Sequence, residues 1–218
     1  MKISLKKSIL FSGLILIVLF LFNVFWSTGF FRTIENKFDG EIFKQIKLKG
    51  AEDITVSHID SFAIISSTAR KSFPNIEQEK GGLYFLDLKN KNFKLIHLTN
   101  NFKKPFAPHG ISIFKKNNYY IIAAINHTLD GEFIEIFKLT GTKLTHQKSL
   151  KHKLIFSPND IVLFDENKFY FTNDHKYRKG LNRLAEDYLG LALSNVIYFD
   201  GIRFFEVANE SAFANGIN

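Results

Sequence analysis

Four short polar motifs recur along the sequence at similar intervals, and each stands next to an apolar, strand-like run. The motifs are Glu52-Asp53, Pro108-His109-Gly110-Ile111, Asn159-Asp160 and Asn215-Gly216. Counted from Glu52 through His109 and Asn159 to Asn215, the intervals are 57, 50 and 56 residues. This spacing is close to one four-stranded propeller blade plus a long loop, so it predicts one site that successive repeats build together.

The motifs supply carboxylate, amide and backbone oxygens. Calcium takes about six to eight oxygen ligands of these kinds and needs no thiolate. The chain has no cysteine, which excludes disulfides, thiol nucleophiles and cysteine-rich zinc sites. The sequence therefore predicts a calcium site.

Composition and length set the outer limits. The 25 phenylalanines suit a β-rich core with large side chains on the strand faces. The 218 residues allow one well-buried domain but fall short of the roughly 240–300 that six propeller blades need. The chain also stops inside a motif, at residues 214–218, which predicts a C-terminal truncation. The net charge of +8 is spread along the chain, so we expect a solvated basic surface rather than a nucleic-acid partner.

The N-terminus predicts a membrane-targeting segment. Lys2, Lys6 and Lys7 precede an apolar run from Ile9 to Trp26, which is long enough to cross most of a hydrocarbon core. Because a cleaved signal peptide has a shorter apolar region and a small-residue cleavage site, an uncleaved anchor is favoured. The expected domains are a signal anchor at 1–31 and a polar domain at 32–218, with the basic end in the cytoplasm and the domain outside it.

Beyond the anchor, short runs with a period of two predict strands. They are Phe62–Ser66, Leu83–Leu88, Phe93–Leu98, Tyr119–Ile125, Phe133–Leu139, Ile161–Phe164, Phe169–Thr172, Val196–Phe199 and Ile202–Val207. One helix is predicted at Leu181–Leu193, with an apolar face of Leu181, Leu184, Tyr188, Leu191 and Ala192. Repeated strands with one inserted helix favour an all-β propeller over a sandwich.

A longer series of motifs carries a family resemblance. In order, it comprises Gly50-Ala51-Glu52-Asp53, Pro108-His109-Gly110-Ile111-Ser112, Asn126-His127, His152-Lys153-Leu154, Asn159-Asp160-Ile161-Val162, Phe169-Tyr170 with Thr172-Asn173-Asp174-His175, Tyr188-Leu189-Gly190-Leu191-Ala192 and Phe213-Ala214-Asn215-Gly216-Ile217-Asn218. This series resembles the paraoxonase/arylesterase family in order and spacing over about residues 45–218, and the hydrophobic N-terminal helix matches as well. Each motif alone is common, but the ordered series is specific.

The resemblance implies a six-bladed β-propeller with two calcium ions in its central tunnel, incomplete in this chain at about four blades. Three residues would bind the catalytic calcium ion: Glu52, Asn159 and Asn215. The structural ion would be held by Asp53, Asp160 and the backbone carbonyl of Ile111. Neighbouring side chains diverge in a strand or tight turn, so adjacent residues can serve different ions.

The resemblance also implies an activity, the hydrolysis of small lactones, aryl esters and organophosphates. Calcium would polarise the substrate carbonyl and stabilise the oxyanion. His109 would be the base that activates water, His127 its partner in a dyad, and Asp174 a residue that orients the site. The sequence has no Gly-x-Ser-x-Gly elbow, which agrees with water as nucleophile.

Each assignment has a simpler alternative. An Asp or Asn at a strand end is often a turn or cap residue, and a histidine is often structural. The family also draws an Asp-Asn pair of calcium ligands from a blade beyond Asn215, so this chain alone is expected to be weakly active or inactive. A non-enzymatic, calcium-stabilised propeller scaffold and an inactive truncated gene product remain the alternatives.

Overall fold

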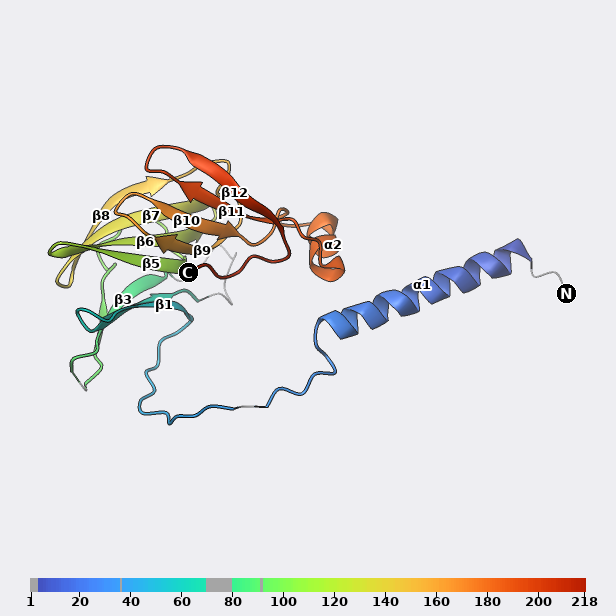
Figure 1. Cartoon of the computed structure of the whole chain (residues 1–218), viewed down its shortest axis with the longest axis horizontal. Helices are drawn as coiled ribbons and strands as arrows, with labels where there is room; N and C mark the ends of the chain where they lie inside the picture. Colours follow the sequence, from blue (N-terminus) through green and yellow to red (C-terminus); the bar gives the residue numbers. More distant parts are fainter. Residues whose placement is uncertain (1–3, 36, 70–79, 91) are drawn as a thin grey trace. The chain divides into compact units, whose positions relative to one another are not determined.

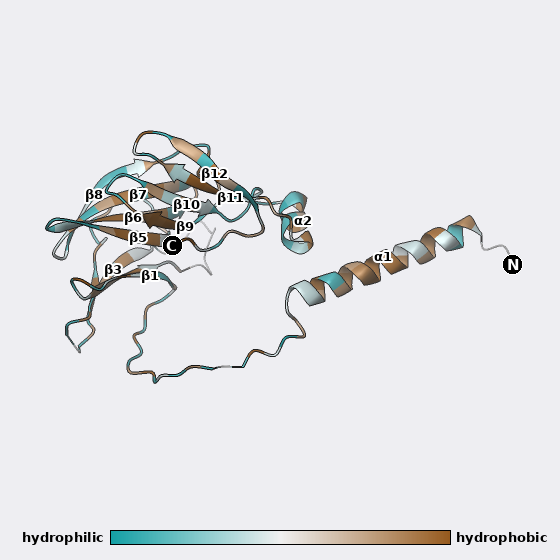
Figure 2. Cartoon of the chain, in the orientation of Figure 1, coloured by the Kyte–Doolittle hydropathy of each residue, from teal (hydrophilic) through white to brown (hydrophobic). Residues whose placement is uncertain are grey.

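The computed structural model describes residues 4–35, 37–69, 80–90 and 92–218, and Lys2 lies outside them. The chain divides into two units, Met1–Gln45 and Ile46–Asn218, which are described separately. In the first unit, α1 (Leu5–Ser27) contains the predicted apolar run (Figure 2), and an 18-residue window of this helix has a mean hydropathy of 2.6. Its length and composition suffice to cross a membrane, and a secretory signal sequence has the same properties.

The second unit is mostly β. Within the described residues, twelve strands form three four-stranded antiparallel sheets, each a simple meander (Figure 1). The first sheet holds β1 (Ala51–Ser57), β2 (Phe62–Ser67), β3 (Gly82–Asp87) and β4 (Leu95–His97). The second holds β5 (Pro108–Lys116), β6 (Tyr119–Thr128), β7 (Gly131–Thr140) and β8 (Lys143–Leu150). The third holds β9 (Pro158–Leu163), β10 (Phe169–Asn173), β11 (Ser194–Phe199) and β12 (Phe204–Ser211), with α2 (Leu181–Leu189) between β10 and β11.

The second sheet is the centre of the hydrophobic core because both of its faces are covered. On β6, Ile121 and Ile125 pack with residues of the third sheet such as Phe171. The alternate residue Ile122 packs with Ile64 of the first sheet. Side chains alternate across a strand, so a strand buried on both faces has a continuous apolar sequence, as β6 does.

The three sheets meet along their first strands. β5 lies against β1 on one side and β9 on the other. Hydrogen bonds cross both boundaries: Ser66 Oγ donates to the backbone oxygen of His109 (2.7 Å), and the Leu163 amide donates to Ser112 Oγ (2.9 Å). The predicted all-β character is therefore confirmed, while the number of blades stays a prediction.

Some element boundaries differ from the prediction. Three strands, β1, β5 and β8, were not predicted, and two of them contain the first two polar motifs. The helix predicted to reach Leu193 ends at Leu189, because Gly190 adopts a φ of +62° and terminates it. Leu191 and Ala192 therefore lie outside the helix.

Candidate functional site

The first strand of each sheet carries the same irregularity at the same place. Over Ala51–Ile54, β1 takes three residue steps while its partner β2 takes two. β5 does the same over residues 108–111, and β9 over residues 158–161. A β-bulge of this kind bends the strand and re-aims side chains. The residues inside the three bulges are Glu52-Asp53, His109-Gly110 and Asn159-Asp160, so the sequence motifs coincide with the bulges.

Gly110 allows the second and third sheets to touch. A Cβ at this position would lie 2.5 Å from the backbone oxygen of Asn159 and 2.7 Å from the Cα of Asp160. Backbone atoms in a packed interior cannot move aside as a flexible side chain can. The glycine is therefore required for the close approach of the bulges in β5 and β9.

A pocket of about 460 Å³ opens where the bulged strands meet. Six of the nine predicted site residues line it: Glu52, His109, His127, Asn159, Asp174 and Asn215. The remaining lining is formed by Thr68, Ala107, Pro108, Ser157, Pro158, Arg183 and Phe213. The lining comes from all three sheets, from α2 and from the segment after β12, so motifs far apart in sequence converge on one cavity.

The two histidines predicted as a dyad are neighbours in this pocket. The ring centroids of His109 and His127 are 5.2 Å apart, with an angle of 74° between the ring planes. Each ring has its Nδ1 next to a carboxylate: His109 Nδ1 lies 3.2 Å from Oε1 of Glu52, and His127 Nδ1 lies 2.5 Å from Oε2 of Glu132. Because a carboxylate accepts hydrogen bonds, each contact favours the tautomer with the proton on Nδ1.

Asp174, predicted to orient the site, holds two side chains of the pocket wall. Ser157 Oγ donates to its Oδ1 (2.5 Å), and Asn159 Nδ2 donates to its Oδ2 (3.2 Å). The buried ring of His175 is next to Asp174, with 3.0 Å between His175 Nδ1 and Asp174 Oδ1. This distance is short enough for an ion pair, but the two atoms do not have the geometry of a hydrogen bond. His175 Nε2 is bound instead to Asp187 of α2 (2.8 Å). Asp174 thereby fixes the amide of Asn159 in the pocket wall.

Two further predicted residues, Asp53 and Asp160, are close enough to repel each other. The amide of Ile111 donates to Asp53 (2.8 Å), and that of Ile217 donates to Asp160 (2.9 Å). Burial raises the pKa of Asp160 above its ordinary value of 3.8; the amide donors of Ile217 and Ile161 oppose this, and the negative charge of Asp53 adds to it. Two partly buried carboxylates whose charges repel each other are a favourable place for a cation.

The donors of the predicted calcium sites are mixed. Within the described ranges, no group of three or more His, Cys, Asp or Glu is arranged to hold a metal ion. The set predicted for the catalytic ion has one carboxylate and two side-chain amides, and the set predicted for the structural ion has two carboxylates and one backbone carbonyl. Neither set therefore contains three side chains of these four types. Calcium binds all of these oxygen types, so the donor set fits it by its chemistry. Ile111 meets Asp53 through its amide, which donates to the carboxylate.

Two residues beside the pocket, Glu132 and Arg178, were not predicted from the sequence. Glu132 binds His127, and Arg178 donates to the other oxygen of Glu132. Asp130-Gly131 is a turn signal in the sequence, but the two-residue turn lies at Leu129-Asp130, and this register places residue 132 opposite residue 127. Arg178 lies 46 residues from Glu132, and no local pattern links them.

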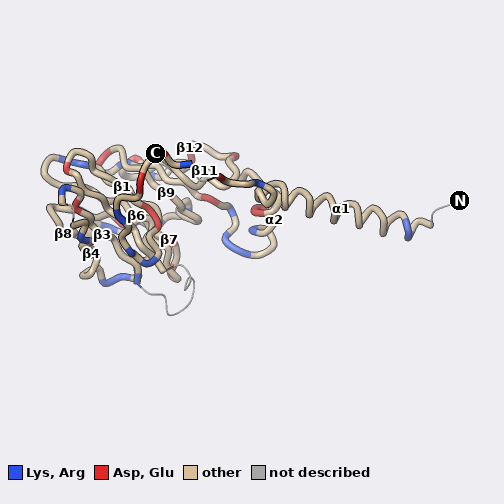
Figure 3. Tube along the Cα trace, turned by 90° about the horizontal axis from the view of Figure 1, so that it is seen from below, with Lys and Arg blue, Asp and Glu red and all other residues tan. Residues whose placement is uncertain are grey.

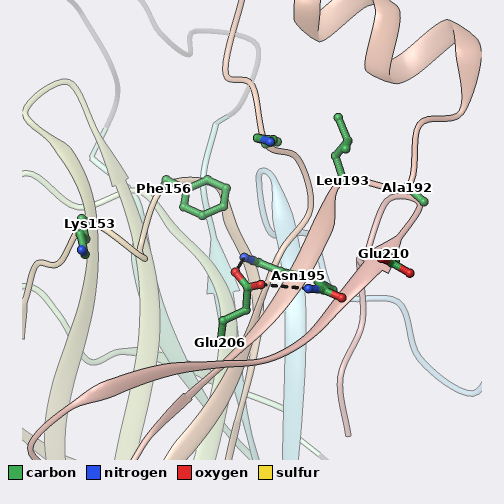
Figure 4. A pocket seen from close by; sticks show the side chains of 9 residues that line it. Lys153, Phe156, Ala192, Leu193, Asn195, Glu206 and Glu210 are labelled. Atoms are coloured by element: carbon green, nitrogen blue, oxygen red, sulfur yellow. Dashed lines mark hydrogen bonds between the residues drawn. The ribbon is translucent and has the colours of Figure 1, made fainter.

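A second hollow of about 520 Å³ lies beside β11 and β12 (Figure 4). Its lining consists of Lys153, Phe156, Lys176, Ala192, Leu193, Asn195, Glu206, Asn209 and Glu210. The carboxylate of Glu206 accepts hydrogen bonds from Asn195 (2.7 Å) and Asn209 (3.2 Å). None of the nine predicted site residues is part of this lining, so the smaller pocket at the bulges is the candidate site.

Comparison with known proteins identifies a matching family and several relatives. The family model described as arylesterase matches residues 34–218. Serum paraoxonase/arylesterase 1 of Homo sapiens is 35% identical over 181 residues, covering 78% of this chain and 50% of that protein. Serum paraoxonase/arylesterase 2 of Gallus gallus is 33% identical over 179 residues, with the same coverage. Serum paraoxonase/lactonase 3 of Oryctolagus cuniculus is 32% identical over 175 residues, covering 77% of this chain and 49% of that protein. The chain thus spans about half the length of the curated relatives it matches.

Proposed function

Because the chain belongs to the arylesterase family, we propose that it hydrolyses carboxylic esters, in particular lactones and aryl esters, with calcium as cofactor. The pocket at the three bulges carries this proposal: two imidazoles, two carboxylates and two carboxamides face one cavity. The names of the relatives, arylesterase and lactonase, support the substrate classes. The substrates are small molecules with an ester carbonyl.

Water is the nucleophile in this proposal. The pocket contains two hydroxyl side chains, and both donate to oxygen atoms rather than to an imidazole. Thr68 Oγ1 donates to the backbone oxygen of Pro108 (2.7 Å), and Ser157 Oγ donates to Asp174 (2.5 Å). A nucleophilic Ser or Thr needs a base that takes its proton, so these contacts favour attack by water.

The histidines move the proton. His109 takes it from the attacking water at Nε2, because Glu52 faces Nδ1. The hydroxide oxygen bonds to the carbonyl carbon, and the resulting tetrahedral oxyanion collapses with cleavage of the ester C–O bond. The proton then passes to the departing alkoxide or phenoxide, and His127, whose ring lies beside that of His109, shares the charge in the dyad. The products are a carboxylic acid and an alcohol or phenol.

Oxygen donors of the three bulges and of Asn215 would hold calcium. The catalytic ion would be bound by Glu52, Asn159 and Asn215, and the structural ion by Asp53, Asp160 and the carbonyl of Ile111. Bound calcium supplies positive charge at the substrate carbonyl, an effect worth several kcal/mol in the transition state. Asp174 supports the site by fixing the amide group of Asn159.

The same proposal covers architecture and location. Three meanders that meet along their first strands support a β-propeller in which each sheet is one blade, as part of a six-bladed whole. We assign residues 1–31 to a signal anchor and 32–218 to the hydrolase domain. Lys6 and Lys7 lie before the apolar run of α1, which supports a domain outside the cytoplasm.

The test is hydrolysis of phenyl acetate and of a δ-lactone by the full chain in detergent, with calcium and with excess chelator. We expect slow turnover that the chelator abolishes, together with a calcium-dependent rise in the melting temperature. Turnover that is indifferent to the chelator would contradict the calcium mechanism. Calcium-dependent melting without turnover would support the scaffold alternative instead.

A further inference from the structure

The imidazole of His127 is held by the buried carboxylate of Glu132, which also binds Arg178. Its Nδ1 lies 2.5 Å from Oε2 of Glu132, the residue directly opposite it in the β6–β7 hairpin. The other carboxylate oxygen of Glu132 accepts a hydrogen bond from Nη2 of Arg178. Arg178 belongs to the basic segment that precedes α2 (Figure 3).

Glu132 is buried, whereas its partner Arg178 reaches the surface. The side chain of Glu132 is 4% exposed, whereas that of Arg178 is 51% exposed. A buried carboxylate costs several kcal/mol unless each oxygen has a donor, and here His127 and Arg178 provide one donor each. The position of the carboxylate is therefore fixed from two directions.

The contact determines which nitrogen of His127 carries the proton. A carboxylate offers lone pairs and no hydrogen, so Nδ1 of His127 must be the donor. The lone pair of the neutral ring is then on Nε2. This is the tautomer that can accept a proton on the side of the ring away from Glu132.

We propose that Glu132, held by Arg178, is a positioning residue for the His109–His127 dyad. It fixes the tautomer and the ring orientation of His127, in the way that a carboxylate orients imidazole in other hydrolytic sites. The inference rests on the proposed function for its kinetic consequences, but the tautomer of His127 can be measured without any activity.

The same strand offers a matched comparison. Glu135 is also buried on β7 and binds a histidine, with 2.8 Å between its Oε2 and His146 Nε2. The His146 ring packs against Phe102 and Phe137 and is not part of the pocket lining. Glu135 therefore controls for the loss of a buried carboxylate–imidazole pair on β7.

The first experiment compares the full chain with Glu132→Gln by NMR, with ¹⁵N-labelled histidine and His127→Gln for assignment. Arg178 can only donate, so the new amide oxygen turns towards it and the amide nitrogen faces His127. Nδ1 must then accept, and we expect His127 to change from the Nδ1–H to the Nε2–H tautomer. Glu135→Gln is expected to leave the tautomer of His127 unchanged.

The second readout is kinetic. Loss of an orienting carboxylate is expected to lower kcat by about 10–100-fold in Glu132→Gln, with KM within about twofold because substrate contacts are kept. Glu135→Gln should keep kcat within about twofold. An equal fall in both variants would show a general loosening of β7 and would overturn the positioning role.

A further variant covers the case in which Glu132→Gln does not fold. Glu132→Asp keeps the charge but draws the carboxylate back by about 1.5 Å, so we expect a reduced kcat with an unchanged KM. A wild-type kcat in this variant would contradict the proposal, as would an unaltered His127 tautomer in a folded Glu132→Gln. A changed tautomer in a protein without ester turnover would support the positioning role and refute the proposed function.

Discussion

The first and fourth strands of the three sheets differ in what their polar residues do. β1, β5 and β9 are bulged at the motifs, β5 lies against both β1 and β9, and their polar side chains surround a pocket. β8 and β12 are also rich in polar residues, but β12 is exposed at every position after Phe204, and β8 alternates between exposed and half-buried positions before Lys148. Polarity alone therefore does not make a site. The site arises where the backbone brings bulged strands together.

The largest stability effect is expected at the contact between β5 and β9. Gly110→Ala places a Cβ against the backbone of Asn159 and Asp160, and we expect a loss of about 3 kcal/mol in the free energy of unfolding. Gly141→Ala, in the outer turn before β8, meets open space and only the strain of a φ of +58°, which costs about 1–2 kcal/mol. Urea unfolding measures both. Equal losses would remove the distinction between inner and outer strands.

A smaller effect is expected at Ser66, which joins two bulges. Its fully buried hydroxyl accepts from the amide of Asp53 (3.1 Å) and donates to the backbone oxygen of His109 (2.7 Å). Ser66→Ala leaves both backbone groups without this partner, and we expect a loss of about 2 kcal/mol in unfolding free energy. Thr145→Ala on the exposed face of β8 should stay within about 0.5 kcal/mol of the wild type. A Ser66→Ala protein as stable as the Thr145→Ala control would refute the bridging role.

The smallest effect is expected in the outer turn before β12. The amides of Arg203 and Ile202 donate to Asp200 and lower the pKa of its carboxyl below the ordinary value of 3.8. The stabilisation is therefore complete above pH 3.8 and is lost as the pH falls through the lowered pKa of the folded protein. Asp200→Asn should flatten the fall of the urea midpoint in this acidic range. An unchanged dependence of the urea midpoint on pH would show that the hydrogen bonds in this turn do not contribute to stability.

Much of the fold could be predicted because burial leaves a pattern in the sequence. The continuous apolar run of β6 predicted a strand, since a strand covered on both faces has no polar side. β1 and β5 escaped prediction because a bulge shifts the period of two and the motif residues interrupt the apolar pattern. β8 was missed because its polar side chains face outwards, and such a strand resembles a loop in sequence.

The candidate site could be predicted only as far as it lies in motifs. His109 and Asn159 stand in short, recurring motifs, and the structure places both in one pocket. Glu132 is separated from the motifs by a hairpin, and Arg178 reaches it from the segment before α2. Contacts of this kind depend on tertiary packing, which a local pattern does not record.

The role of the bulged first strands can be tested by comparing two histidines, one on an inner strand and one on an outer strand. Rates of phenyl acetate and lactone hydrolysis are measured with calcium for the full chain, for His109→Gln on β5 and for His146→Gln on β8. We expect kcat/KM to fall about a hundredfold or more in His109→Gln, because the base is lost, and to stay within about twofold in His146→Gln. Similar rates for the two variants would contradict the claim that the chemistry resides at the bulged first strands.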